Sequence, residues 1–425
     1  MKDRYDVVIV GGGPGGMGAA FYIKEHSDLS VLIIDKSNLE LSGLRNDCKQ
    51  NYTFPIGFTE DLWDEEKANI LIKEVKKHLK PIYCKKNNIE KYKNRAKSLG
   101  VEIIDVEQSH VGTDKSGALI NRLVNELKEL GVEYHLGENV EKIIYEDKKV
   151  ITDKGEEYYF DNIVLSLGRA NFKGLQKFLD DLNVGYSDNI IDIGIRVETK
   201  AENYSIVNDY YDPKIKFGNN LKTRTFCTNS GNAHVVQERY EKYKTVNGHA
   251  YSEDKDKNGL VNFALLKTIK LTDPITSGQE FAEIIGQAAM KIGGGKPIMQ
   301  RVGDFRMGKR SKAETFNNDL YDFKPTLNAT PGDLRLVAPY LLMKDLWTSL
   351  KLLDNIVINI LSPSTILYFP EIKCYANRPI FIDDFFQVKE GVYCCGDSGG
   401  VSRGIVGAWC SSIVCAQGIL KKYEV

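Results

Sequence analysis

Short runs of apolar residues near the start of the chain are separated by a turn that is rich in glycine. Residues 5–10 form a run rich in valine and isoleucine, which predicts a buried strand. The segment GGGPGG follows it, and residues 17–24 continue as a predicted helix. A second apolar run, residues 31–34, ends at Asp35. Strand, glycine turn, helix and strand together predict a βαβ unit of about 30 residues.

The pattern changes twice farther along the chain. Residues 118–130 carry apolar side chains at helical spacing, with lysine and glutamate on the other face. From about residue 172 the pattern becomes one of mixed strands and loops, and it returns to a buried strand at residues 392–395 and a helix at 405–420. We therefore expect an α/β fold, a Rossmann-like dinucleotide-binding domain that is interrupted by a mixed β/α (α+β) substrate domain. The expected boundaries are residues 1–171 and 373–425 for the dinucleotide-binding domain and 172–372 for the inserted domain.

Composition and charge exclude several classes of function. The 425 residues are 42% hydrophobic and 27% charged, as in an ordinary globular protein. The net charge of -1 leaves no electrostatic footprint for nucleic acid or an anionic membrane, and no apolar run approaches the roughly 20 residues of a membrane span. The eight cysteines form no C-x-x-C pair, and the six histidines are scattered. We therefore expect a cytoplasmic protein without a metal site.

The glycine turn has the spacing of a dinucleotide-binding motif. Gly11, Gly13 and Gly16 follow a strand and open a helix, so backbone N–H groups can meet a pyrophosphate where a side chain would collide. Asp35 ends the second strand, where a carboxylate can accept hydrogen bonds from ribose hydroxyls. The intervening Pro14 and Gly15, and Lys36 after the aspartate, belong to the same candidate site. Both NAD and FAD fit this turn.

The C-terminal segment favours FAD. GVYCCGDSGGVSRGIVGAW, residues 391–409, resembles the second FAD signature of flavoproteins with two dinucleotide-binding motifs. The resemblance implies that Asp397, preceded by Gly396, holds the ribitol, and that Arg403, Gly404 and Ile405 begin a helix whose positive end faces the flavin and stabilises its reduced anion. SLGRA, residues 166–170, resembles the segment in such proteins that passes under the FAD, with Gly168 at its centre.

Five segments together carry a resemblance that spans nearly the whole chain. They are SGLRNDCKQN (42–51), HVGTDKSG (110–117), SLGRA (166–170), FPEIK (369–373) and GDSGGVSRGI (396–405). The chain resembles a group of uncharacterised FAD-dependent dehydrogenases, NAD(FAD)-utilising dehydrogenase-like proteins related to the glutathione-reductase-type FAD fold. The resemblance implies a split FAD domain and a substrate domain over the isoalloxazine, without naming a substrate. The chain has Cys48 where members of this group tend to have glycine.

The loop after the second strand supplies the candidate catalytic residues. In this type of fold the loop runs along the flavin, so Lys49 could contact N5 or the C2 carbonyl, and Arg403 could tune the ring from the other side. Cys48 is either a redox-active thiol or, as we favour, a small residue in place of a glycine. The candidate catalytic residues are Lys49, Cys48 and Arg403, and the candidate cofactor-binding residues are Gly11, Gly13, Pro14, Gly15, Gly16, Asp35, Lys36, Arg45, Asn46, Asn51, Val140, Gly168, Gly396, Asp397, Gly404 and Ile405.

The inserted domain contributes a basic segment, GDFRMGKR. Arg301, Arg306, Lys309 and Arg310 either bind a carboxylate or phosphate of a substrate or electron donor, or form a solvated surface loop. No second G-x-G-x-x-G follows a strand in the sequence. NAD(P)H would therefore act as a transient reductant that docks over the flavin, unless an electron-donor protein supplies the electrons.

These observations lead to one principal expectation. Bound FAD would exchange a hydride at N5 with an unidentified small organic substrate held by the inserted domain. The alternatives are a flavoprotein that modifies RNA, which the near-neutral charge disfavours, and a flavin-binding sensor or assembly partner without catalysis.

Overall fold

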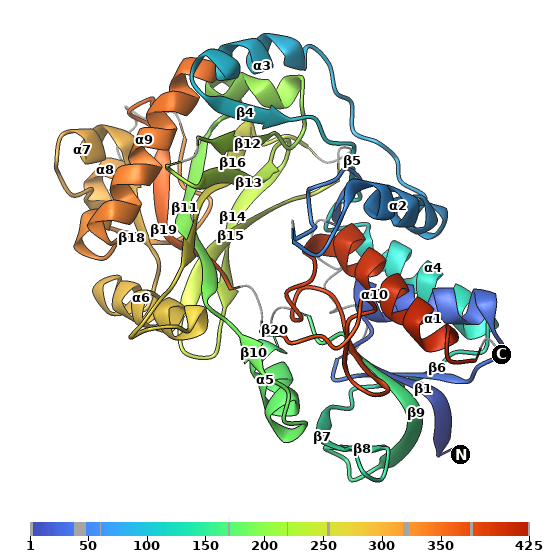
Figure 1. Cartoon of the computed structure of the whole chain (residues 1–425). Coiled ribbons are helices and arrows are strands. Elements are labelled where there is room, and N and C mark those ends of the chain that lie inside the picture. Colours follow the sequence, from blue (N-terminus) through green and yellow to red (C-terminus); the bar gives the residue numbers. More distant parts are fainter. Residues whose placement is uncertain are drawn as a thin grey trace. The chain divides into compact units, whose positions relative to one another are not determined.

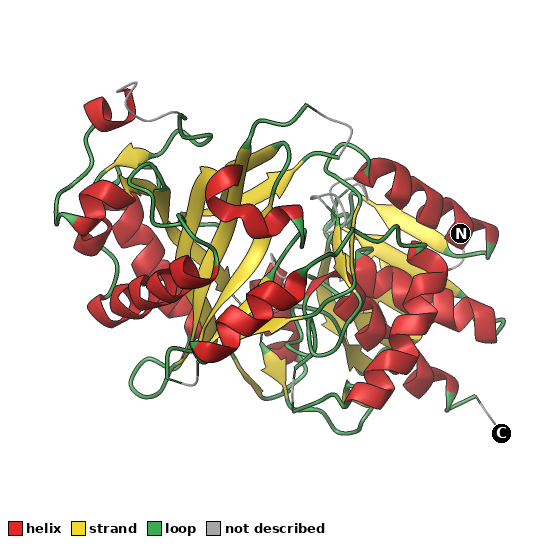
Figure 2. Ribbon diagram, turned by 90° about the horizontal axis from the view of Figure 1, so that it is seen from above, coloured by secondary structure: helices red, strands yellow, loops and turns green. Residues whose placement is uncertain are grey.

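A computed structural model gives the structure of residues 3–37, 48–59, 61–168, 171–218, 220–252, 256–317, 323–374 and 377–423. The chain divides into two units, coloured along the sequence in Figure 1. Unit 1 comprises residues 1–82, 109–188 and 375–425, and unit 2 comprises residues 83–108 and 189–374. Figure 2 distinguishes the helices and strands of both units.

The parallel sheet of unit 1 is built around β1 (Arg4–Val10), which pairs in parallel with β2 (Val31–Asp35) and β9 (Glu157–Leu165). Its order is β21-β22-β9-β1-β2-β6, with β7 and β8 attached through β9. The remaining strands of this sheet are β6 (Glu133–Leu136), β7 (Val140–Ile144), β8 (Lys149–Thr152), β21 (Gln387–Lys389) and β22 (Val392–Cys394). The parallel arrangement confirms the predicted α/β class with its Rossmann-like βαβ start.

Successive side chains along a strand point to opposite faces of the sheet, and in this sheet apolar side chains lie on both faces. Val7 and Ile9 of β1 pack with four helices, whereas Val8 and Val10 pack with the β7–β8 meander and α5. The strand is therefore buried on both sides, as a central parallel strand must be. The helices on the first face are α1 (Pro14–His26), α2 (Glu65–Leu79), α4 (Ser116–Glu129) and α10 (Gly404–Leu420), and α5 spans Phe172–Asp181 on the second.

A largely antiparallel sheet forms the centre of unit 2, in the order β18-β17-β19-β11-β16-β13-β12-β4. Its two longest strands, β11 (Ile190–Lys200) and β16 (Leu260–Lys270), pair along their whole length. The others are β4 (Val101–Ile104), β12 (Lys214–Phe217), β13 (Thr223–Asn229), β17 (Ile298–Arg301), β18 (Thr330–Pro331) and β19 (Ile366–Cys374). A separate hairpin consists of β14 (Ala233–Arg239) and β15 (Lys244–Ala250).

The two faces of β11 differ in chemistry. Ile191, Ile193, Ile195 and Val197 belong to the apolar cluster that α3 (Ile89–Ser98), α6 (Gly278–Ile292) and α9 (Tyr340–Ile356) share. The alternate residues include the fully buried Arg196, whose Nε and Nη2 donate to the two carboxylate oxygens of Glu371 at 2.6 and 2.7 Å. A buried charge needs such a partner, so each of these residues depends on the other.

Short elements complete the described chain. They are β3 (Lys49–Asn51), β5 (Gln108–His110), β10 (Tyr186–Ser187), β20 (Arg378–Pro379), α7 (Val302–Arg306), α8 (Ala313–Asn317) and the 3₁₀ turns η3 (Ala201–Asn208) and η4 (Leu334–Leu336). Within the part of the chain that the structure describes, no helix is both long enough and apolar enough to cross a bilayer.

The boundaries between the two units differ from those predicted from the sequence. The expected boundaries were 171/172 and 372/373, whereas the units separate after Asp188 and after Cys374. Residues 83–108 were expected in the first domain and lie in unit 2. The reason is that β4 pairs antiparallel with β12, from Val101 opposite Phe217 to Ile104 opposite Lys214.

The first prediction concerns Gly18, where α1 and α10 approach each other closely. A Cβ atom at Gly18 would lie 2.6 Å from Cδ1 of Trp409 and 2.5 Å from Oγ of Ser412. We expect Gly18→Ala to lower the free energy of unfolding by about 1–3 kcal/mol, since a packed core does not admit an extra methyl group. Chemical denaturation measures the change. Gly117→Ala in α4, where no heavy atom of the part of the chain that the structure describes lies within 4 Å of the added Cβ, is the matched control. Equal stability of the two variants would contradict the packing argument.

A second prediction concerns His78, which packs beside Phe21 and Trp409 with ring centroids 4.3 and 5.7 Å away. Burial lowers the pKa of His78 below the usual histidine value of about 6.5. Below that value the unfolded chain binds a proton that the folded chain does not, so stability falls as the pH drops from about 6.5 towards the folded pKa. We expect His78→Phe, which keeps an aromatic ring, to make this fall shallower. Urea titrations between pH 8 and 5 test it, and parallel curves for both proteins would refute it.

Candidate functional site

The glycine turn between β1 and α1 leaves no room for side chains on its inner side. Gly11 has a φ of +105°, and a Cβ there would lie 2.4 Å from the carbonyl oxygen of Ser166. A Cβ at Gly16 would lie 2.0 Å from the carbonyl oxygen of Gly11. At Gly13, by contrast, no heavy atom of the described residues lies within 4 Å of the Cβ position. The backbone therefore packs closely behind the turn and faces open space in front of it.

That open space lies at the N-terminus of α1. Gly13 is the N-cap residue and has no side chain that could cap the helix. Pro14 lies in the first turn, which contains no acidic residue. The N–H groups of a helix start carry a partial positive charge and bind phosphate. Gly13, Gly15 and Gly16 could thus hold the pyrophosphate of a dinucleotide with backbone atoms alone.

Asp35 stands beside this turn at the carboxyl end of β2. Its Oδ2 accepts a hydrogen bond from the N–H of Gly12 at 2.7 Å, and its Oδ1 accepts from the N–H and Oγ of Ser37, both at 2.9 Å. The carboxylate is half-buried, and Lys36 next to it is exposed. A ribose attached to a phosphate at the turn would lie within reach of this carboxylate, because ligands of parallel sheets bind outside the carboxyl ends of the strands.

A polar cluster that the sequence analysis missed supports the end of β2. The N–H of Glu138 donates to the carbonyl oxygen of Asp35 at 3.1 Å. The hydroxyl of Tyr158 lies 2.6 Å from Nδ1 of His135 and donates to the Glu138 carboxylate at 3.3 Å. Burial raises the pKa of Tyr158, so its hydroxyl keeps its proton. The candidate Val140 follows in β7, is buried, and pairs with Thr152.

The C-terminal signature forms a second helix start. Oδ1 of Asp397 accepts a hydrogen bond from the N–H of Gly404 at 2.9 Å, at the first residue of α10. Gly396 has a φ of +74°, and its N–H donates to Oγ of Ser411 in the same helix at 2.9 Å. The loop is thereby fixed on α10 at two points. Ile405 in the first turn is buried.

The two signatures from opposite ends of the sequence are neighbours in unit 1. A Cβ at Gly15 would lie 3.3 Å from Sγ of Cys395 and 3.3 Å from Cβ of Ser166. Oγ of Ser166, in the SLGRA segment, donates to the carbonyl oxygen of Gly11 at 2.7 Å. Two helix starts and two carboxylates therefore occur at the same edge of one parallel sheet. Gly168, with a φ of +71°, continues from this contact.

The loop before β3 is described only in part. Arg45 and Asn46 lie outside the described residues, whereas Lys49 and Asn51 are half-buried in β3. Cys48 is buried and has a φ of +55°, in the left-handed region that favours glycine. This conformation explains why a glycine would suit the position, and it favours the structural interpretation of Cys48 over a redox role.

Among the buried polar atoms that have no hydrogen-bond partner within the described residues, two lie next to candidate cofactor-binding residues. They are Nε2 of Gln50, which lies between Lys49 and Asn51, and Oγ of Ser398, which follows Asp397. Buried donors of this kind normally find a partner. Together with the open space at Gly13, they fit a site that a polar cofactor completes.

The basic segment of unit 2 does not act as one cluster. Arg301 is fully buried, donates to the carbonyl oxygens of Ser364 and Phe323, and lies about 5 Å from the centroids of two phenylalanine rings. Arg306 is exposed and donates to the carbonyl oxygen of Leu361. The prediction of a single anion-binding cluster is therefore wrong for Arg301, because its partners are in the core; Lys309 and Arg310 are exposed.

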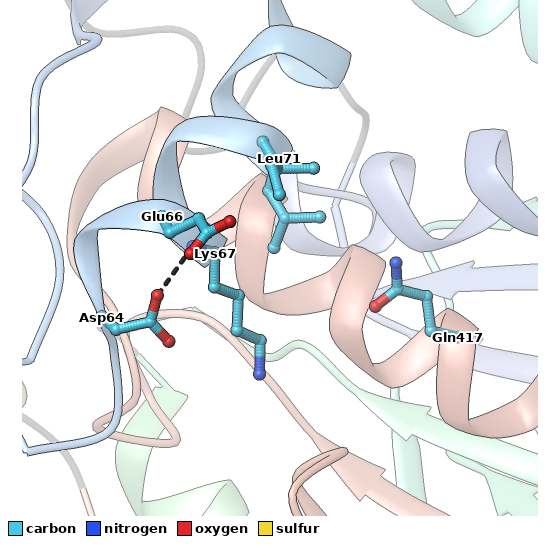
Figure 3. Close-up of a pocket in the computed structure, with 6 residues that line it drawn as sticks. Asp64, Glu66, Lys67, Leu71 and Gln417 are labelled. Carbon is cyan, nitrogen blue, oxygen red and sulfur yellow. Dashed lines mark hydrogen bonds between the residues drawn. The ribbon is translucent and has the colours of Figure 1, made fainter.

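A surface hollow lies between α2 and α10, away from both signatures (Figure 3). The N–H of Lys67 donates to Oδ1 of Asp64 at 2.8 Å on its rim. It is lined by Asp64, Glu66, Lys67, Ile70, Leu71 and Gln417. It includes none of the candidate residues.

Comparison with known proteins gives distant likenesses. No family model matches the chain. An uncharacterized protein of Clostridium beijerinckii is 24% identical over 98% of this chain and 81% of its own length. Among solved structures, a geranylgeranyl bacteriochlorophyll reductase-like protein of Thermoplasma acidophilum is 14% identical, with a TM-score of 0.45 over 100% of this chain and 80% of its own. Glycine oxidase of Bacillus cereus is 14% identical, with a TM-score of 0.39 over 98% and 95%.

Asp397 gives the prediction for this site. Asp397→Ala removes the acceptor for the first N–H of α10, and we expect a loss of about 1 kcal/mol in the free energy of unfolding. Asp397→Asn, which keeps an acceptor oxygen, should retain most of the stability. Denaturant titrations of protein freed of any bound small molecule measure both variants, and a loss of the same size in both would show that the capping bond does not matter.

Proposed function

We propose that this protein is an FAD-dependent oxidoreductase that exchanges a hydride between flavin N5 and a small organic substrate. One observation carries the proposal. The open N-terminus of α1, with Asp35 beside it, and the N-terminus of α10, with Asp397 beside it, begin at the same edge of the parallel sheet of unit 1. In FAD, the pyrophosphate and the ribitol lie between the adenosine and the flavin ring. One set of contacts can therefore bind each half of the molecule.

FAD is favoured over NAD by the second set. A nicotinamide dinucleotide is held at a Rossmann turn by the first helix start and the ribose-binding acid. The additional helix start at Gly404, whose N–H is bonded by Asp397 of the preceding loop, supplies binding groups for a ribitol and for the pyrimidine end of a flavin. The sequence also lacks a second glycine fingerprint for NAD(P)H, so we propose that a reductant docks transiently or that a donor protein supplies electrons.

Each group of residues has a separate task in this proposal. FAD, when bound, supplies the N5 atom that accepts or releases the hydride. The backbone of Gly13, Gly15 and Gly16 binds the pyrophosphate, and Asp35 binds the adenosine ribose. Asp397 orients the ribitol, and the first N–H groups of α10 favour negative charge at the adjacent ring edge.

The residues around the ring determine its chemistry. Lys49 and Arg403 are the cations that we place nearest the flavin, where a positive charge stabilises its reduced form. Gln50 and Ser398 offer the buried donors that lack a partner among the described residues. Cys48 serves as the residue that turns the backbone into β3, and we assign it no electron transfer.

Gly13 provides the experiment. Gly13→Ala places a methyl group in the open space at the start of α1, where the fold has room for it. We expect the variant to be as stable as the unliganded wild type and to bind FAD at least tenfold more weakly, since the methyl group occupies the pyrophosphate position. Purified protein is tested for a yellow chromophore, which acid releases for identification by mass spectrometry.

The control and the opposing outcomes follow from the same geometry. Gly117→Ala, which also adds a methyl group in open space, should leave FAD binding intact. Reduction of the holoprotein by NADH, NADPH or dithionite, followed by reoxidation with a series of organic acceptors, then distinguishes an enzyme from a sensor. Folded wild-type protein that is colourless and does not take up added FAD would overturn the proposal.

A further inference from the structure

The β14–β15 hairpin of unit 2 carries two histidines directly opposite each other. His234 and His249 form a cross-strand pair in the antiparallel register, with ring centroids 6.0 Å apart and ring planes at 61°. The ring of Tyr251 lies beside both, at 5.9 Å from His234 and 5.4 Å from His249. All three side chains are half-buried. The register of the hairpin thus brings together two of the histidines that looked scattered in the sequence.

A hydrogen-bond chain fixes the proton on His234. Nδ2 of Asn232 donates to the carbonyl oxygen of Asp256 at 2.8 Å, which turns Oδ1 of Asn232 towards Nε2 of His234 at 2.6 Å. Because an amide oxygen only accepts, Nε2 must carry the hydrogen, and the lone pair of the neutral ring is on Nδ1.

The orientation of His234 is one that metal-binding histidines share. A ligating imidazole donates its other N–H to an oxygen that holds the ring in place, and Asn232 supplies that oxygen. Two imidazole nitrogens that bind one ion at about 2.0–2.1 Å place their ring centroids about 5–6 Å apart. The observed separation of 6.0 Å is at the upper end of this range, within a small side-chain rotation.

We infer that His234 and His249 form a binding site for a divalent transition-metal ion. Imidazole nitrogens suit Zn²⁺, Ni²⁺, Co²⁺ and Cu²⁺, whereas Mg²⁺ and Ca²⁺ require oxygen ligands. Within the described residues no three histidine, cysteine, aspartate or glutamate side chains gather around one point, so the protein supplies two ligands there. The remaining positions of the ion are left to water or to an exogenous anion, as in sites that exchange ligands.

The experiment uses full-length protein without an affinity tag. Co²⁺ is titrated into the protein and followed by its visible absorption, and equilibrium dialysis with Zn²⁺ gives the stoichiometry. We expect one ion per chain, and a loss of at least tenfold in affinity for His234→Gln and for His249→Gln. Asn232→Leu should weaken binding by about tenfold to a hundredfold, because the ring loses its orienting partner. His26→Gln, an exposed histidine of α1, is the matched control and should bind as the wild type does.

A second measurement does not depend on the variants folding. Exchange of the histidine C2 hydrogen for deuterium, followed by mass spectrometry of wild-type peptides, should slow at His234 and His249 when Zn²⁺ is present and stay unchanged at His26. Co²⁺ or Zn²⁺ binding that persists in both glutamine variants, exchange that is insensitive to Zn²⁺ at the pair, or no binding at all would each overturn the inference. None of these outcomes depends on whether the protein binds FAD.

Discussion

The close contact between the glycine turn and the strand ends behind it is the constraint on which unit 1 depends. Gly11 lies against Ser166 and Gly16 lies against Gly11 at distances that exclude larger side chains, and Gly15 lies in tight contact with Cys395. These contacts place α1 so that its start faces open space while its length packs on α10. Backbone atoms are exposed towards a ligand only because the backbone behind them is packed so tightly.

Much of unit 1 could be predicted because its signals are local. The strand at β1, the helix from Pro14, the strand ending at Asp35 and the helix from Gly404 all occur where the apolar pattern and the glycines predicted them. The placement of residues 83–108 could not be predicted, since β4 depends on a strand far along the chain. Pairing between distant strands leaves no periodic signature in either strand.

The candidate site divides in the same way. The glycines and aspartates of the two signatures were found because a strand end and a helix start fix their neighbours within a few residues. The cluster of His135, Glu138 and Tyr158 was missed, because only the sheet register brings it to Asp35. Arg301 was misread because sequence alone does not tell a buried guanidinium from a solvated one. The opposed histidines of β14 and β15 likewise depend on register.

The position of α10 affects how the protein is made. This helix fills the space beside α1 and holds the Gly396 loop, yet it is synthesised after the last segment of unit 2. The glycine turn is synthesised before unit 2 and before α10. Its packing partner α10 is therefore absent while unit 2 is being produced. The segments of unit 2 precede α10 in the sequence, so unit 2 can fold before the packing of unit 1 is complete.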